Sequence, residues 1–258
     1  MLINAVVIIL REVLEASLIM GVLLALSQLN LVSKSWCIKG LSLGGVLAVF
    51  YAANLTIISA VHGGVGQEIV NAGLYIFIFI FVLTIIYSLR DKQKSNVTVA
   101  AMFACVVLAV VREGSEIIVY IQGFSTINEL FAPVLIGSSI GTGIGLSIGV
   151  FVYYLIVNLP VLYGLRLGFF VLVFIASGMV SQAIQMLLQA DLLTSQLPVW
   201  NTSEIVSEQS FVGEILFAMI GYEATPTLVQ VVLYAFSILL TSFMAINSIR
   251  CIQRRGLS

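Results

Sequence analysis

The strongest constraint on this chain is a group of charged residues in the middle of an apolar stretch. Arg11, Glu12 and Glu15 form the pattern Arg-Glu-x-x-Glu inside the hydrophobic run Leu2–Leu29. The pattern recurs at residues 112–116 inside a second apolar run. A charge at the centre of a membrane helix costs about 2.5 to 3.5 kcal/mol on insertion scales, so three per helix must be offset by pairing. Charges kept at such a position are typical of a functional site.

The spacing of the motif places its charges on one side of a helix. Residues i, i+1 and i+4 fall within an arc of about 100°, so each motif presents one guanidinium and two carboxylates together. The i, i+4 geometry predicts pairing of Arg11 with Glu15 and of Arg112 with Glu116, which leaves the first glutamate of each motif short of a counter-charge. If the two faces meet, the site suits a hard cation held by oxygen ligands. The predicted ligands are Glu12, Glu15, Glu113 and Glu116, with Arg11 and Arg112 as charge partners.

Composition places the motifs in a polytopic membrane protein. The 258 residues are 60% hydrophobic and 9% charged, and the mean hydropathy is +1.15. Seven runs are long enough to span a bilayer at about 1.5 Å per residue. The fold class predicted is therefore all-α with seven transmembrane helices, over Leu2–Leu29, Gly40–Val61, Ile69–Leu89, Val97–Ile121, Phe131–Val157, Leu167–Leu188 and Thr227–Ile249.

Basic residues alternate between the connections. They follow the first, third and seventh runs and precede the sixth, at Lys34, Lys39, Arg90, Lys92, Lys94, Arg166, Arg250, Arg254 and Arg255, whereas the other connections hold none. The positive-inside rule then predicts an outside N-terminus and a cytoplasmic C-terminus.

An internal repeat accompanies the two motifs. Arg11 and Arg112 are 101 residues apart, and the same offset carries the small residues 40, 44 and 48 onto glycines 141, 145 and 149. Small residues every fourth position allow close helix packing in lipid. Because three helices separate the copies, the repeat predicts a 3+3 inverted arrangement with one added helix. The expected divisions of this single membrane domain are 1–95, 96–190, an outer loop 191–225, a seventh helix 226–249 and a cytoplasmic tail 250–258.

Other polar residues suggest an ion path. Thr98, Met102 and Cys105 continue the motif face of the fourth run, although ordinary packing explains them as well. Gln182, Gln185 and Gln189 share one face of the sixth run, where amides either join helices or line a hydrated path. The outer connection holds four glutamates and no basic residue, so it gathers cations, docks a partner or is simply a solvated acidic loop.

Several function classes fit poorly. The last run contains no lysine for a retinal Schiff base, the lone His62 gives no haem ligation within the helices, and no nucleophile and base constellation indicates a hydrolase. Nothing points to nucleic acid as a partner. The alternative is that both motifs are purely structural ion pairs. It is disfavoured because buried ion pairs add little stability over apolar packing.

With these residues in view, the chain resembles the oxidase-dependent high-affinity iron permeases of fungi and their EfeU-type bacterial relatives. Two Arg-Glu-x-x-Glu motifs, in the first and fourth of seven helices, are that family's hallmark. Further similarity lies in Ala176-Ser177-Gly178-Met179, Leu188-Gln189-Ala190-Asp191, Val199-Trp200-Asn201-Thr202-Ser203, Gly213-Glu214-Ile215-Leu216, Gly221-Tyr222 and Pro226.

The resemblance implies a multi-pass permease of the cell membrane that moves iron inward, with the four glutamates as ligands. Iron is then cargo, and no resident cofactor is indicated. It also implies an extracytoplasmic oxidase or iron-binding partner, and a homo-oligomer is compatible with it. Ser115, and Ser181, Gln182 and Gln185 of the sixth run, depart from the family pattern. The resemblance does not decide between Fe²⁺ and Fe³⁺ as the cargo. Lead, manganese or protons are the alternative cargo.

Overall fold

The computed structural model describes residues 2–91, 95–194, 197–208 and 210–256. Within these ranges the chain is mostly helical. The helix connections are short except for the long one between Gln189 and Phe211, and one isolated bridge joins Pro198 and Thr227. The helices are α1 (Leu2–Leu29), α2 (Ser35–Ala53), α3 (Leu55–Ser59), the 3₁₀ turn η1 (Val61–Gly64), α4 (Gly66–Ser88), α5 (Ser95–Phe124), α6 (Asn128–Val157), α7 (Val161–Gln189), α8 (Phe211–Ile220) and α9 (Leu228–Gly256).

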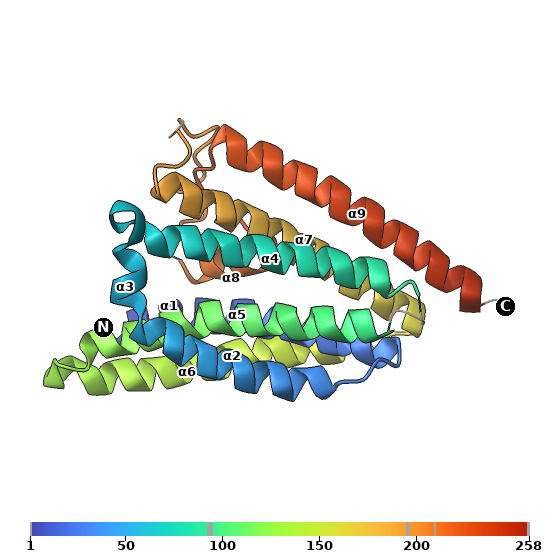
Figure 1. The fold of residues 1–258 in the computed structure, drawn as a ribbon, viewed down its shortest axis with the longest axis horizontal. Coiled ribbons are helices and arrows are strands. Elements are labelled where there is room, and N and C mark those ends of the chain that lie inside the picture. Colours follow the sequence, from blue (N-terminus) through green and yellow to red (C-terminus); the bar gives the residue numbers. More distant parts are fainter. Residues whose placement is uncertain (1, 92–94, 195–196, 209, 257–258) are drawn as a thin grey trace.

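Six of these helices are long and apolar enough to cross a membrane: α2, α4, α5, α6, α7 and α9. The seventh predicted span is α1, which has 28 residues and carries the three charges of the first motif. The predicted class, an all-helical polytopic membrane protein, therefore agrees with the structure. The long helices lie roughly side by side along the length of the molecule (Figure 1).

Several predicted boundaries were wrong. The second span was placed at Gly40–Val61, but α2 begins at Ser35 and ends at Ala53, where the Asn54 side chain donates to the carbonyl of Phe50 at 2.8 Å. α3 and η1 then form a separate turn. α7 begins directly after Pro160, earlier than predicted, because proline is well suited to precede a helix. α9 continues to residue 256, so most of the predicted tail is helical.

Glycines allow the closest helix contacts. A Cβ atom on Gly141 of α6 would lie 2.6 Å from the carbonyl oxygen of Val6 on α1, and one on Gly145 would lie 2.9 Å from a Val13 methyl carbon. A Cβ atom on Gly44 of α2 would similarly lie 2.8 Å from the Val110 side chain on α5. The fourfold spacing of small residues thus lets backbones approach, as predicted from the sequence.

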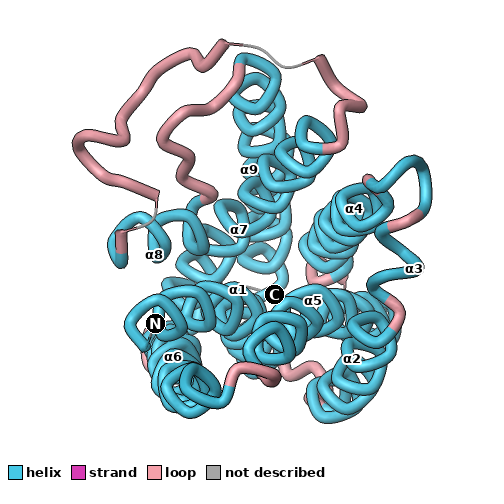
Figure 2. Tube along the Cα trace, turned by 90° about the vertical axis from the view of Figure 1, so that its left-hand side faces the viewer, coloured by secondary structure: helices cyan, strands magenta, loops and turns pink. Residues whose placement is uncertain are grey.

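The most extensive helix contacts are those of α1 with α6 and of α2 with α5. The first helix of each half of the chain therefore packs against the second helix of the other half. α4 and α7 contact one another, and α9 lies against both of them. Figure 2 shows this arrangement along the helices, with α1 and α5 adjacent and α4 and α7 next to them.

The two ends of the bundle differ in their connections. The N-terminus, the α2–α4 turn and the α5–α6 turn lie at one end, and the C-terminus lies at the other with the α1–α2 and α6–α7 turns (Figure 1). Outside the two motifs, the described Lys and Arg residues belong to the C-terminal end of the bundle. Lys92 and Lys94 of the predicted basic turn, and residues 257–258 of the predicted tail, lie outside the described residues.

The predicted outer loop contains a helix that the sequence reading missed. α8 begins after Ser210, whose hydroxyl accepts a hydrogen bond from the Gly213 amide at 3.0 Å, and ends at Gly221 with φ of 66°. Both are ordinary helix-end signals, a serine N-cap and a left-handed glycine. α8 packs against α1 and α7 and so reaches the motif on α1.

Candidate metal site

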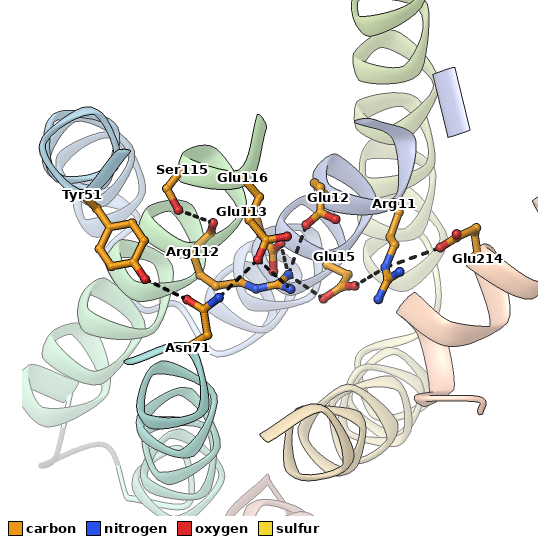
Figure 3. A network of polar contacts seen from close by, with 10 residues as sticks. All are labelled: Arg11, Glu12, Glu15, Tyr51, Asn71, Arg112, Glu113, Ser115, Glu116 and Glu214. Atoms are coloured by element: carbon orange, nitrogen blue, oxygen red, sulfur yellow. Dashed lines mark hydrogen bonds and ion pairs between the residues drawn. The ribbon is translucent and has the colours of Figure 1, made fainter. Parts of the chain in front are cut away.

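The two motifs meet between α1 and α5, and one guanidinium lies among all four motif carboxylates (Figure 3). Arg112 Nη1 is 3.2 Å from Glu12 Oε2 and 3.5 Å from Glu15 Oε2, and it also pairs with Glu113. Arg112 Nη2 is 3.2 Å from Glu116 Oε1. The carboxylates of two helices therefore converge on a single cation supplied by the chain itself.

The intrahelical pairs form as predicted, but the charge balance differs. Arg11 Nε is 3.6 Å from Glu15 Oε1, and Arg112 pairs with Glu116. The expectation that Glu12 and Glu113 lack a counter-charge was wrong, because Arg112 contacts both. Helix periodicity fixes neighbours within one helix, whereas these contacts depend on how closely α1 and α5 approach.

Burial is graded across the cluster. The side chains of Glu15, Glu113 and Arg112 are almost fully buried, whereas that of Glu116 keeps 30% of its surface exposed. Charged groups that are shielded from water in this way are stabilised only by close ion pairs and hydrogen bonds. Glu116 is therefore the most solvent-accessible of the four motif carboxylates.

The two arginines differ in their surroundings. Arg11 turns away from the centre toward α8, where its Nε is 3.4 Å from Glu214 Oε2 and its guanidinium carbon lies 3.9 Å from the centre of the Phe217 ring. Burial raises the pKa of Glu214, against the opposing effect of Arg11. Glu214 was expected in an outer connection that gathers cations, docks a partner or is simply solvated. The apolar residues around it were the signal that could have placed it here.

Helices α2 and α4 supply further contacts that the sequence reading missed. Asn71 Nδ2 donates to Glu116 Oε1 at 3.4 Å, and the Tyr51 hydroxyl donates to Asn71 Oδ1 at 3.2 Å (Figure 3). The Arg112 guanidinium carbon lies 4.7 Å from the centre of the Tyr75 ring, a cation–π distance. Asn71 and Tyr75 are four residues apart in an apolar run, a spacing that places them on one face of α4.

A cavity of about 380 Å³ leads to the cluster from the N-terminal end of the bundle. Glu12 and Glu116 line it, together with oxygen-bearing side chains of α2, α4, α5 and α7: Tyr51, Gln67, Glu68, Asn71, Ser115, Tyr120 and Gln189. The cavity connects solvent with the most exposed part of the carboxylate cluster.

The donor set suits a hard cation. Within the described ranges no three His, Cys, Asp or Glu side chains are arranged to hold a metal ion as they stand. The guanidinium of Arg112 instead occupies the space between the carboxylates. Carboxylate oxygens, without thiolate or imidazole, are the ligands that hard cations prefer. A metal ion could use these carboxylates only after Arg112 has moved.

Comparison with known proteins identifies the family. The model of the iron permease FTR1 family matches residues 2–255, almost the whole chain. The chain belongs to this family. No curated protein and no solved structure gave a significant match. The FTR1 family comprises iron permeases, so the chain is a transporter-family member rather than an enzyme, and the apolar helices are those of a multi-pass membrane protein.

Thr98, Met102 and Cys105 were predicted to continue an ion path along the fourth run. In this FTR1-family chain all three are buried in the core. Cys105 and Met102 are fully enclosed, and Met102 Sδ accepts a hydrogen bond from the Ser27 hydroxyl at 3.2 Å. The Thr98 hydroxyl donates to Ser88 Oγ at 2.9 Å. Thr98 also lines a second cavity of about 370 Å³ at the C-terminal end of the bundle. The two cavities share no lining residue.

The three glutamines of α7 have different surroundings in the FTR1-family fold. Gln182 is buried beside Glu15, and its carbonyl oxygen has no hydrogen-bond partner among the described residues. Gln185 Nε2 donates to Glu223 Oε1 at 3.4 Å in the α8–α9 connection. Gln189 lines the outer cavity. Of these three glutamines, only Gln182 reaches the carboxylate cluster. The helix face that they share therefore does not line one continuous ion path.

Proposed function

We propose that this chain carries iron inward across the cell membrane and that the four motif glutamates bind the ion in transit. The observation that carries the proposal is the position of Arg112, whose guanidinium contacts all four carboxylates. It acts as a built-in substitute cation in the ion-free protein. Iron arriving through the outer cavity displaces it and takes the carboxylates as ligands.

Electrostatics favours this exchange. Four carboxylates, three of them buried, share the single charge of Arg112, and Arg11 contacts only Glu15 among them. An ion of charge two or three in place of the guanidinium balances more of the cluster and coordinates oxygen directly. Without either cation the buried carboxylates repel one another, so Arg112 also preserves the site between transport events.

The topology we propose has seven spans, with the N-terminus outside and the C-terminus in the cytoplasm. The length of α1 supports its inclusion as a span, because pairing with α5 offsets the cost of its charges. The basic residues at the C-terminal end of the bundle support the orientation. The reciprocal packing of α1 with α6 and α2 with α5 supports two inverted repeats, as in many secondary transporters.

Transport then requires the outer cavity to close and the inner one to reach the carboxylates. The layer between them contains Cys105 and Met102, and Thr98 lies at the edge of the inner cavity. An inside-negative potential of 100 mV favours inward movement by about 4.6 kcal/mol for Fe²⁺ and about 7 kcal/mol for Fe³⁺. The potential therefore favours inward movement of either ion without requiring a co-transported ion.

Related cargo forms the second candidate. A carboxylate site is not strongly selective by ligand type, so lead, manganese or protons are the competitors to test. The resemblance to oxidase-dependent permeases also suggests an extracytoplasmic oxidase or iron-binding partner and leaves a homo-oligomer possible. The outer segment around α8, which contacts Arg11 through Glu214, is where such a partner would influence the site.

The test is accumulation of radioactive iron in proteoliposomes under an imposed inside-negative potential, with ferrous and ferric iron supplied separately. We expect wild-type protein to accumulate iron and Glu12→Gln and Glu113→Gln to accumulate none, while all three reconstitute equally. Glu204→Gln, at an exposed position in the outer segment, is the matched control and should transport normally. Normal transport by both motif variants would exclude the site, and uptake of lead, manganese or protons in place of iron would favour the second candidate.

A further inference from the structure

Two buried polar atoms on facing side chains have no hydrogen-bond partner among the described residues. They are the hydroxyl oxygen of Tyr75 and Nε of Arg112. Tyr75 is 1% exposed, and its ring lies against the Arg112 guanidinium. An unpartnered hydroxyl is costly in the interior of a membrane protein. A phenylalanine would make the same ring contact without that cost, so the hydroxyl needs a separate explanation.

Binding of a cation forces Arg112 to move. Its two terminal nitrogens fill the space between the carboxylates, and iron cannot bind those oxygens while they remain there. A displaced guanidinium is a buried charge that needs new partners at once. Tyr75 offers an aromatic face already in contact with it and a hydrogen-bond acceptor that is unused.

We propose that Tyr75 receives the guanidinium of Arg112 when iron takes its place among the glutamates. The ring supplies a cation–π contact and the hydroxyl accepts a hydrogen bond from the displaced guanidinium. This inference rests on the proposed iron site. Tyr75 is a positioning residue that acts through Arg112 and does not touch the ion.

A direct role for Tyr75 as an oxygen ligand fits the geometry less well. Arg112 lies over the face of the ring. An ion that replaced the guanidinium would therefore also lie over the ring face, away from the in-plane lone pairs of the hydroxyl. If Tyr75 receives the guanidinium, both the Tyr75 hydroxyl and Arg112 Nε can gain a partner. If Tyr75 is an iron ligand, only its hydroxyl is accounted for.

Iron binding by purified Tyr75→Phe tests the proposal. We expect roughly tenfold weaker binding than in wild type, the order of effect of one hydrogen bond to a charged group. The melting temperature of the iron-free variant should be unchanged or higher, because the hydroxyl has no partner before iron binds. Tyr154→Phe, at an exposed position on α6, is the control and should change neither quantity. Unchanged iron affinity, or a lower melting temperature without iron, would overturn the proposal.

A second variant separates the receiving role from a ligand role. In an Arg112→Gln background, Tyr75→Phe should cause no further loss of iron affinity, because no guanidinium remains to be received. Loss in both backgrounds, or a visible tyrosinate-to-iron charge-transfer band in ferric-loaded wild type, would identify a ligand and overturn the proposal. If Arg112→Gln does not accumulate, the spectrum of ferric-loaded wild type distinguishes the two roles. Absence of the charge-transfer band, together with the tenfold loss of iron affinity in Tyr75→Phe, supports the receiving role.

Failure of the iron site itself has a different signature. If wild type binds no iron, or if Glu113→Gln binds it normally, the proposed function fails. If Glu113→Gln loses binding while Tyr75→Phe keeps it, only the role of Tyr75 fails.

Discussion

Arg112 Nη1 lies 3.2 Å from Glu12 Oε2, although the two residues are one hundred positions apart in the chain. This contact joins the two Arg-Glu-x-x-Glu motifs into one cluster. It also separates the roles of the two arginines, since Arg112 lies within the cluster and Arg11 turns toward α8.

Arg112→Leu should accumulate poorly, because it leaves four carboxylates, three of them buried, without their shared counter-charge. Removal of one partner from a buried ion pair costs about 3 to 5 kcal/mol. The measurement is the amount of folded protein in the membrane and its melting temperature in detergent. Arg166→Leu, at an exposed position in α7, should resemble wild type. Normal accumulation and melting of Arg112→Leu would contradict the pairing described here.

Glu214→Gln should weaken iron binding by about two- to fivefold. Without the charge of Glu214, Arg11 turns more fully to Glu15 and competes there with the ion. A partly exposed pair of this kind contributes about 0.5 to 1 kcal/mol, which sets the size of the effect. Iron titration of purified protein measures it, with Glu204→Gln in the same outer segment as control. Equal or tighter binding by Glu214→Gln would show that Arg11 does not compete.

Gly141→Ala should destabilise the protein by about 2 kcal/mol, the range expected for overpacking. The new methyl group would meet the Val6 carbonyl oxygen at 2.6 Å, and backbone atoms cannot move aside as a flexible side chain can. Gly143→Ala on the same helix is the matched control, because nothing lies within 4 Å of its Cβ position. Thermal melting of both variants compares them. An equal effect of the two changes would argue against close contact between α1 and α6.

The pH dependence of stability should change in Glu223→Gln. Burial raises the pKa of Glu223 from 4.5 to about 7, with a smaller opposing effect of its hydrogen bond from Gln230. The folded protein therefore binds a proton that the unfolded chain releases above pH 4.5, so Glu223 lowers stability as pH rises from about 4.5 through 7.

Glutamine does not titrate, and the variant should therefore melt at a higher temperature than wild type at pH 8. The difference should shrink toward pH 5, where Glu223 is protonated in the folded protein. Melting curves at several pH values measure this difference. A gap that grows as pH falls would mean that Glu223 is ionised and stabilising.

Whether a contact could be predicted from sequence depended on how far apart its residues lie along the chain. The pairs of Arg11 with Glu15 and of Arg112 with Glu116 follow from helix geometry, which is the same in any context. The close packing at Gly141 follows from small-residue spacing. Charged motifs within apolar runs were enough to predict a membrane protein with an ion site. The iron permease family was predicted from the resemblance of the two motifs and of several further segments, and the family match confirms it.

Contacts between elements distant in sequence could not be predicted in this way. The reach of Arg112 to Glu12 depends on the separation and rotation of α1 and α5. Tyr75 lies in an apolar run where a buried tyrosine looks like ordinary core. Glu214 belongs to a short helix whose apolar surface was hidden in a long acidic connection, and it became visible only once α8 was placed against α1.

The contacts of Arg112 with Glu12 and Glu15 have a consequence for biosynthesis. In the topology proposed above, Arg11, Glu12 and Glu15 enter the membrane before α5 has been made. About a hundred residues separate the motifs, so at 5 to 20 residues per second α1 waits roughly 5 to 20 s for Arg112. We therefore expect α1 to be held at the insertion machinery or shielded by a chaperone until α5 arrives.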